Sequence, residues 1–172
     1  MKKLLISTIM LLFVTVMSYG QLTPGKSYLG PAIGFGFENS TPTFGANYEY
    51  AINKNLAVGG VFRFNTNTED LLWYEVSYTY LFFGVQGNYH FDGLIEDTKW
   101  DPFAGLILGY RSYSTSVSGG YNWGGTASDG ELFFSAHATM RYWLNPGLGV
   151  QARLEFGSAG SSAIMLGVDF KF

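Results

Sequence analysis

A regular alternation of apolar and polar side chains runs along the chain from residue 28 to the end, and clusters of Gly, Asn, Ser, Asp and Pro interrupt it. Because successive side chains of a β-strand point to opposite faces, this period of two is typical of half-buried strands. No helical periodicity is sustained beside it. The sequence therefore predicts an all-β protein with strands at about 28–37, 43–50, 56–64, 77–91, 100–112, 132–144, 148–157 and 163–172.

The charged residues indicate what each face of these strands meets. Along strand 148–157, large apolar residues occupy one face, and the polar residues Gln151, Arg153 and Glu155 occupy the other. In the neighbouring strands His137 shares a face with Arg141, and Asp169 shares one with Lys171. A basic residue facing lipid near mid-membrane costs about 2–4 kcal/mol, so the charged face should line a barrel lumen and the apolar face should look outward. A secreted soluble β-sandwich with one wet face would alternate in the same way.

The aromatic residues of the apolar face collect at the strand ends. One end carries Phe37, Phe44, Phe64, Tyr110, Phe134 and Phe156, and the other carries Tyr50, Tyr89, Trp100, Tyr142 and Phe172. Two such rings are typical of the interfacial girdles of a membrane barrel. After Met17 no apolar run approaches the roughly 20 residues of a transmembrane helix. We therefore expect an eight-stranded antiparallel up-and-down transmembrane β-barrel.

Two segments depart from the simple pattern. Pro31 has no amide hydrogen to donate, and a closed barrel offers no free edge, so we expect a bulge or a later start of the first strand. In strand 77–91, Gln86, Asn88 and His90 are expected to point inward, but the same parity would turn Tyr78, Tyr80 and Phe82 inward too. A bulge near Leu81 would remove this conflict.

The N-terminus has the organisation of a signal peptide. Lys2 and Lys3 precede an apolar stretch at residues 4–17, and Ser18 and Gly20 supply the small residues of a cleavage site. We expect residues 1–20 to be removed, leaving residues 21–172 as the barrel domain. The rival interpretation is a membrane anchor, but 14 residues span only about 21 Å of a hydrocarbon core near 30 Å. The chain has no cysteine, which excludes disulfides and a lipoprotein anchor, and its net charge of −3 gives no expectation of nucleic-acid binding.

The last predicted strand, AIMLGVDFKF at residues 163–172, ends in an aromatic residue. In this ending and in its strand pattern, the chain resembles the small bacterial outer-membrane β-barrels of OmpA/OmpX type, in the porin-like superfamily. The resemblance implies an integral protein of the cell outer membrane that contacts lipid and lipopolysaccharide. It also implies that Phe170 and Phe172 form the signal read by the barrel-assembly machinery.

An eight-stranded barrel has an interior just wide enough for side chains to fill it, so a wide pore is not expected. The alternation places ten charged or titratable residues in the lumen: Glu49, Arg63, His90, Arg111, His137, Arg141, Arg153, Glu155, Asp169 and Lys171. Buried charges persist only when they are paired, so we expect an ion-pair network without metal or cofactor. The alternative is a narrow ion or small-solute channel gated by those pairs.

Catalysis is not expected, although lipid-A modification is a weaker alternative. Some small outer-membrane barrels act on lipid A with a His-x-Ser pair and a Glu on the lipid face. Here His137-Ala138-Thr139 has Thr in place of Ser, and the parity turns His137 and Glu155 into the lumen.

The expected role is therefore structural, or one of surface interaction through the loops. A periplasmic N-terminus places the turns 51–55, 92–99 and 145–147 in the periplasm, and the loops 38–42, 65–76, 113–131 and 158–162 outside. The longest loop carries Tyr121 and Trp123, the candidate contacts for an unknown surface partner.

Overall fold

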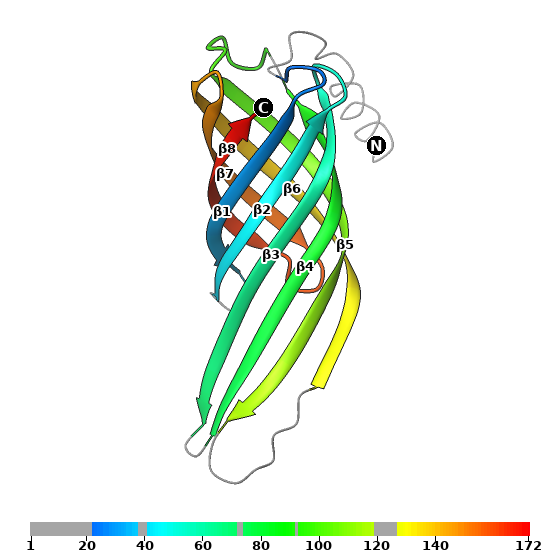
Figure 1. The fold of residues 1–172 in the computed structure, drawn as a ribbon, viewed down its shortest axis with the longest axis vertical. Helices are drawn as coiled ribbons and strands as arrows, with labels where there is room; N and C mark the ends of the chain where they lie inside the picture. Colours follow the sequence, from blue (N-terminus) through cyan, green and yellow to red (C-terminus); the bar gives the residue numbers. More distant parts are fainter. Residues whose placement is uncertain (1–21, 38–40, 72–73, 92, 119–126) are drawn as a thin grey trace, which may run out of the picture.

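The computed structural model describes residues 22–37, 41–71, 74–91, 93–118 and 127–172. They form a closed antiparallel barrel in which each strand pairs with the next and β8 pairs with β1 (Figure 1). The strands are β1 Ser27–Gly36, β2 Thr41–Ala51, β3 Leu56–Leu71, β4 Tyr74–His90, β5 Trp100–Ser118, β6 Ala127–Asn145, β7 Leu148–Gly157 and β8 Ala163–Lys171. The predicted eight-stranded fold is confirmed. No helix among the described residues is long and apolar enough to cross a membrane.

The barrel is inverted relative to a soluble protein. On its outer surface Phe35 and Leu166 are 56% and 61% exposed, whereas Arg141 and Glu49 inside are 0% and 1% exposed. The burial pattern of β7 alternates strictly, with the polar side chains inward. This arrangement is stable where the surroundings are apolar, because a hydrocarbon phase then covers the exposed Phe and Leu side chains.

Pro31 is accommodated differently from the prediction. β1 starts before it, at Ser27, and pairs with β2 in a single register as far as Gly36. β1 pairs with β8 at Leu29 and again at Ala32 in the same register, so this ladder skips Gly30 and Pro31. The predicted bulge or late start is wrong. The missing amide of Pro31 is tolerated because two pairs are lost on one side only.

The predicted bulge near Leu81 is also wrong. β4 pairs with β3 in one register from Tyr74 to Tyr89, and Phe82 therefore points into the lumen, where it is 3% exposed. Inside, Phe82 packs in a projecting-end cluster that we define as Val61, Phe82, Ile107 and Phe133. The inward apolar residues of β4 are thus part of an interior packing layer. A register shift occurs instead in β6 opposite β7, between Trp143 and Asn145.

Strands β3 to β6 continue well beyond the barrel. The pairing of β2 with β3 ends at Asn65, and that of β6 with β7 begins at Ser135. Past these points residues 66–71, 74–80, 113–118 and 127–134 form a four-stranded projecting sheet (Figure 1). The prediction of loops is wrong for residues 65–71, 74–76, 113–118 and 127–131, which lie in strands. The projecting parts of β3 and β5 are rich in Ser, Thr and Asn, so no apolar alternation marks them.

Candidate functional site: the charged lumen

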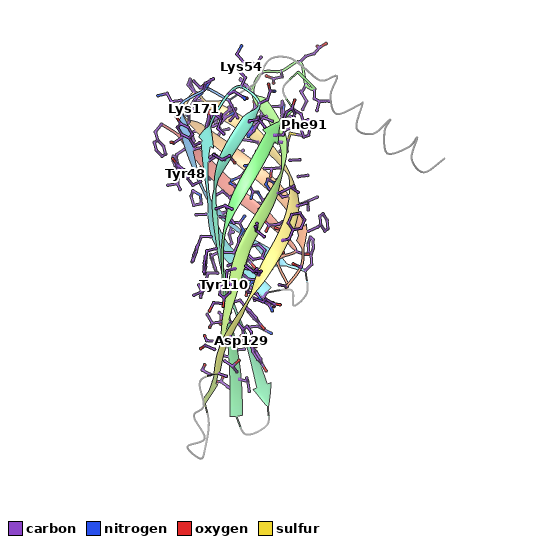
Figure 2. The ribbon with its side chains drawn as sticks, turned by 90° about the vertical axis from the view of Figure 1, so that its right-hand side faces the viewer. Tyr48, Lys54, Phe91, Tyr110, Asp129 and Lys171 are labelled. Atoms are coloured by element: carbon purple, nitrogen blue, oxygen red, sulfur yellow. The ribbon has the colours of Figure 1, made fainter. Side chains whose placement is uncertain are left out.

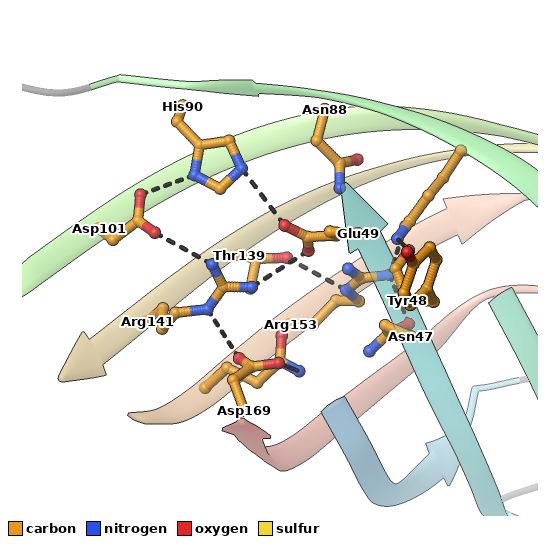
Figure 3. Close-up of polar contacts among 12 residues, drawn as sticks. Asn47, Tyr48, Glu49, Asn88, His90, Asp101, Thr139, Arg141, Arg153 and Asp169 are labelled. Atoms are coloured by element: carbon orange, nitrogen blue, oxygen red, sulfur yellow. Dashed lines mark hydrogen bonds and ion pairs between the residues drawn. The ribbon is translucent and has the colours of Figure 1, made fainter. Parts of the chain in front are cut away.

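Arg141 is the centre of the polar network inside the barrel (Figure 3). From β6 its Nε donates to Asp169 on β8 at 2.7 Å, and its two terminal nitrogens donate to Asp101 on β5 and Glu49 on β2, each at 3.1 Å. A planar guanidinium with five N–H donors can serve three carboxylates at once. One side chain therefore connects four strands across the lumen.

His90 on β4 completes this layer. Its Nδ1 lies 2.7 Å from Asp101 Oδ1, and its Nε2 lies 3.4 Å from Glu49 Oε2. The imidazole also stacks on Phe103, with ring centroids 4.3 Å apart. Because both ring nitrogens lie beside carboxylate oxygens, the geometry fits a doubly protonated, cationic imidazole.

A second layer is built around Glu155. Arg63 lies 3.2 Å from Glu155 Oε2, and Arg153 lies 4.0 Å from the same oxygen. Both guanidiniums also donate to Asn47 Oδ1, at 2.7 and 3.0 Å. Arg153 Nε donates further to Thr139. Two cations share one carboxylate here, so this layer carries a positive surplus, whereas the Arg141 layer carries a negative one.

The two surpluses offset each other. Among the described buried side chains, four carboxylates (Glu49, Asp101, Glu155 and Asp169) face three guanidiniums and His90. With a doubly protonated His90 the charges sum to zero. A low-dielectric interior demands this balance, because an uncompensated buried ion costs several kcal/mol.

His137 belongs to the lumen and is 4% exposed. Its Nδ1 lies 3.1 Å from Thr139 Oγ1 and its Nε2 lies 3.0 Å from Asn88 Oδ1, so neutral polar groups occupy both nitrogens. Glu155 is its cross-strand neighbour on β7. The His-x-Thr element therefore faces away from the outer surface where lipid would lie. No group of three or more His, Cys, Asp or Glu in the described part of the chain is placed to hold a metal ion.

Apolar clusters lie toward both mouths of the barrel. Leu22, Tyr28, Ala51 and Ala57 form a C-terminal-end cluster against which Trp143 packs. At the opposite mouth, Phe82 and Phe133 of the projecting-end cluster meet edge to face with centroids 5.5 Å apart. Arg153 and Glu155 between the mouths are 1% and 2% exposed. A water-filled path would leave such side chains accessible, so the lumen is a packed polar core.

Neither a family model nor a curated protein sequence matches the chain. Several solved structures, in contrast, match its fold. The N-terminal β-barrel domain of Pseudomonas aeruginosa OprF superimposes with a TM-score of 0.64 at 13% identity, covering 87% of this chain and 98% of that one. Yersinia pestis Ail superimposes with a TM-score of 0.58 at 15% identity, covering 87% and 100%.

This chain has the fold of the small outer-membrane β-barrels. A de novo designed transmembrane β-barrel matches as well, with a TM-score of 0.59 at 13% identity over 88% of this chain and 98% of that one. Because a designed barrel shares the likeness, the likeness concerns architecture and assigns no particular role.

Two residues expected in the lumen network lie at the mouths of this outer-membrane-type barrel. Arg111 pairs with Glu131 at the projecting mouth and donates to the carbonyl of Ala159 at 2.7 Å. Lys171 lies at the other mouth, with its Nζ 5.8 Å from the Trp143 ring centroid. Figure 2 shows Lys171 at the barrel end opposite Asp129. The remaining eight expected lumen residues are buried.

Other predicted site residues lie outside the lumen or outside the described residues. Phe170 and Phe172 face outward at the end of the chain, 47% and 62% exposed. Tyr121 and Trp123 fall outside the described residues, as does the segment 1–20.

Sequence reasoning missed Asp101, which is 1% exposed and bonds both His90 and Arg141. The sequence does contain a signal for its inward position. Asp101 shares the parity of Gly105 and Arg111 on β5, the face already expected to point inward. It was overlooked because it is the second residue of the strand, where a turn residue is equally expected.

Proposed function

We propose that the chain is an integral protein of the bacterial outer membrane, without catalytic activity, whose filled barrel holds the projecting sheet rigidly at the cell surface for contact with other molecules. The observation that carries this proposal is the continuation of β3 to β6 as a paired sheet beyond a packed barrel. A packed lumen does not favour transport, so the sheet and the loops beside it are left as the parts able to meet a partner.

The outer face of the sheet supports this placement. The apolar outer surface of the barrel extends to Leu81 and Leu132, and hydroxyl side chains follow it. There Thr66 bonds Thr79 and Thr68 bonds Ser77, at 3.5 and 3.0 Å. A hydroxyl-rich face suits water better than hydrocarbon, so the part of the sheet beyond Leu81 and Leu132 stands clear of the membrane.

The open edges of the sheet favour contact with a partner. In the described part of the chain, residues 66–71 of β3 pair only with β4, and residues 127–133 of β6 pair only with β5. An unpaired edge presents free backbone donors and acceptors. Ail, named as the attachment invasion locus protein, has been crystallised with the heparin analogue sucrose octasulfate. That complex supports a surface-contact role for this architecture.

The biogenesis of the protein belongs to the same proposal. Residues 1–20 act as a signal peptide, and residues 21–172 are the mature chain. The outward Phe170 on β8 and Phe172 directly after it are presented to the barrel-assembly machinery, and β8 is the strand that closes the barrel against β1. The exposed aromatic residues at both ends of the outer face meet phospholipid and lipopolysaccharide.

Cysteine labelling tests the orientation. The chain has no cysteine, so Ser116→Cys in the projecting sheet and Lys54→Cys in the opposite turn each introduce a single thiol. In intact cells a membrane-impermeant maleimide should label the Ser116 variant, and should label the Lys54 variant only after lysis. The reverse pattern would contradict the proposal. A photo-crosslinking residue at Ser116, with Lys54 as the matched control position, then tests whether a partner contacts the sheet.

A further inference from the structure

The projecting mouth contains a small cavity that the packed lumen does not explain. Its volume is about 90 Å³, and its lining includes Asn65, Tyr80, Phe82 and Arg111. A hollow of about 10 Å³ shares Asn65 and Phe82 with it and reaches Arg63 and Ser161. The larger cavity has room for about three waters or for one polar group of a ligand. Phe82 lines both hollows and belongs to the packed projecting-end cluster.

Three buried polar atoms, on residues that line one or the other of these two hollows, lack a hydrogen-bond partner among the described residues. They are Arg63 Nε, Arg111 Nε and Ser161 Oγ, all of which can donate a hydrogen. The Arg63 side chain is 6% exposed and Ser161 is 7% exposed, so bulk water does not satisfy them. Leaving a buried donor unsatisfied is costly, and three at one mouth require an explanation.

The charges around the cavity favour an acceptor that is itself negative. The charged residues that line the two hollows are Arg63, Arg111 and Glu155. Glu155 is already shared by Arg63 and Arg153, and Arg111 is paired with Glu131 at the rim. Two guanidiniums and one carboxylate thus line the hollows, and guanidinium donors form their strongest hydrogen bonds with oxyanions.

Tyrosine rings form the wall next to these donors. Tyr80 and Tyr113 are cross-strand neighbours with ring centroids 6.2 Å apart, and the Arg111 guanidinium lies 5.4 and 5.8 Å from the two rings. The contact with both rings and the bond to Ala159 hold Arg111 at the mouth. Flat amphipathic faces of this size can cover a sugar ring while its charged substituent enters the cavity.

We propose that this mouth binds the carboxylate or sulfate group of an acidic saccharide, with Arg111, Arg63 and Ser161 as donors and Tyr80 as the wall. The proposal rests on the proposed function, because the mouth must face the outside of the cell to meet such a ligand. It deepens that function by naming a ligand class and a place for it.

The test uses the folded barrel in detergent micelles, at constant ionic strength, with the arginine Nε–H signals followed by NMR. Sodium glucuronate and glucose 6-sulfate should shift the Arg111 and Arg63 signals saturably, and glucose should not. Arg111→Gln should weaken glucuronate binding about tenfold, the loss expected for one charge-assisted hydrogen bond. The matched control Lys99→Gln removes one charge at the opposite mouth and should leave binding unchanged.

The outcomes separate the possibilities. Absence of saturable shifts, or an equal loss in the Arg111 and Lys99 variants, would overturn the site. Acetate binding as tightly as glucuronate would overturn its assignment to a saccharide. Tyr80→Leu should weaken glucuronate but not acetate, which provides a second variant if Arg111→Gln fails to fold. These measurements need no membrane, so a negative result leaves the orientation experiment intact. A reversed orientation would refute the proposed function without changing the binding measured in micelles.

Discussion

Replacing Arg141 by Met tests whether the lumen network stabilises the barrel. Methionine keeps an unbranched apolar side chain close in length to the aliphatic stem of the arginine. It removes the guanidinium and with it the three hydrogen bonds to Asp169, Asp101 and Glu49. The three carboxylates then face one another with His90 as the nearest cation. Removing one partner of a buried ion pair costs about 3–5 kcal/mol, chiefly because the remaining charge is uncompensated. We expect a loss of that size in the free energy of unfolding.

The rescue variant distinguishes charge from packing. Adding Glu49→Gln and Asp169→Asn to Arg141→Met leaves Asp101 as the carboxylate of this layer, still 2.7 Å from His90. If uncompensated charge causes the loss, this triple variant should recover at least half of it, about 2 kcal/mol. If lost packing around the arginine stem causes it, the triple variant should be no more stable than the single one.

The assay is equilibrium unfolding by guanidinium of the barrel refolded in lipid vesicles, followed by tryptophan fluorescence. Arg111→Met is the matched control, because Arg111 and its partner Glu131 are partly exposed at the mouth. An exposed pair contributes about 0–1 kcal/mol, so the control should change stability little. A loss below about 1 kcal/mol for Arg141→Met, or a triple variant no better than the single one, would refute the reasoning.

Three further predictions follow from the same architecture. Boiled and unboiled samples should migrate differently in detergent gels, because a closed barrel resists the detergent until it is heated; identical migration would contradict a closed barrel. Leu166→Arg on the outer face should destabilise the barrel in lipid by about 2–4 kcal/mol, measured by the same unfolding assay, whereas Thr68→Arg on the projecting sheet should have almost no effect. Phe172→Ala should lower the amount of protein recovered in the outer membrane by immunoblot, and equal recovery of Phe172→Ala and Phe156→Ala would remove the special role of the C-terminal aromatic residue.

Much of the barrel was determined by the sequence alone. The number of strands follows from the interruptions of the alternating pattern. The period of two sets which face each side chain joins, so it also predicts the outward apolar face and the inward position of His137, Arg141 and Asp169. Lipid outside and a narrow lumen inside then assign the two faces. The inward position of Asp101 follows from the same parity.

Only the tertiary structure decided which lumen residues meet. Glu49 and Asp169 reach Arg141 from β2 and β8, neither of which is a neighbour of β6 in the barrel order. Contacts across the lumen depend on the closure and stagger of the whole barrel, and no local pattern contains either quantity.

The projecting sheet is the other feature that the tertiary structure decided. Thr66 and Ser116 lie in segments with polar residues on both faces, so the sequence carries little contrast between faces and loops were predicted there. The barrel already aligns β4 with β3 and with β5, so their backbone pairing continues in the same register into the projecting sheet. The alternation reports where a strand separates two environments, whereas backbone hydrogen bonding extends a strand wherever its neighbour is in register.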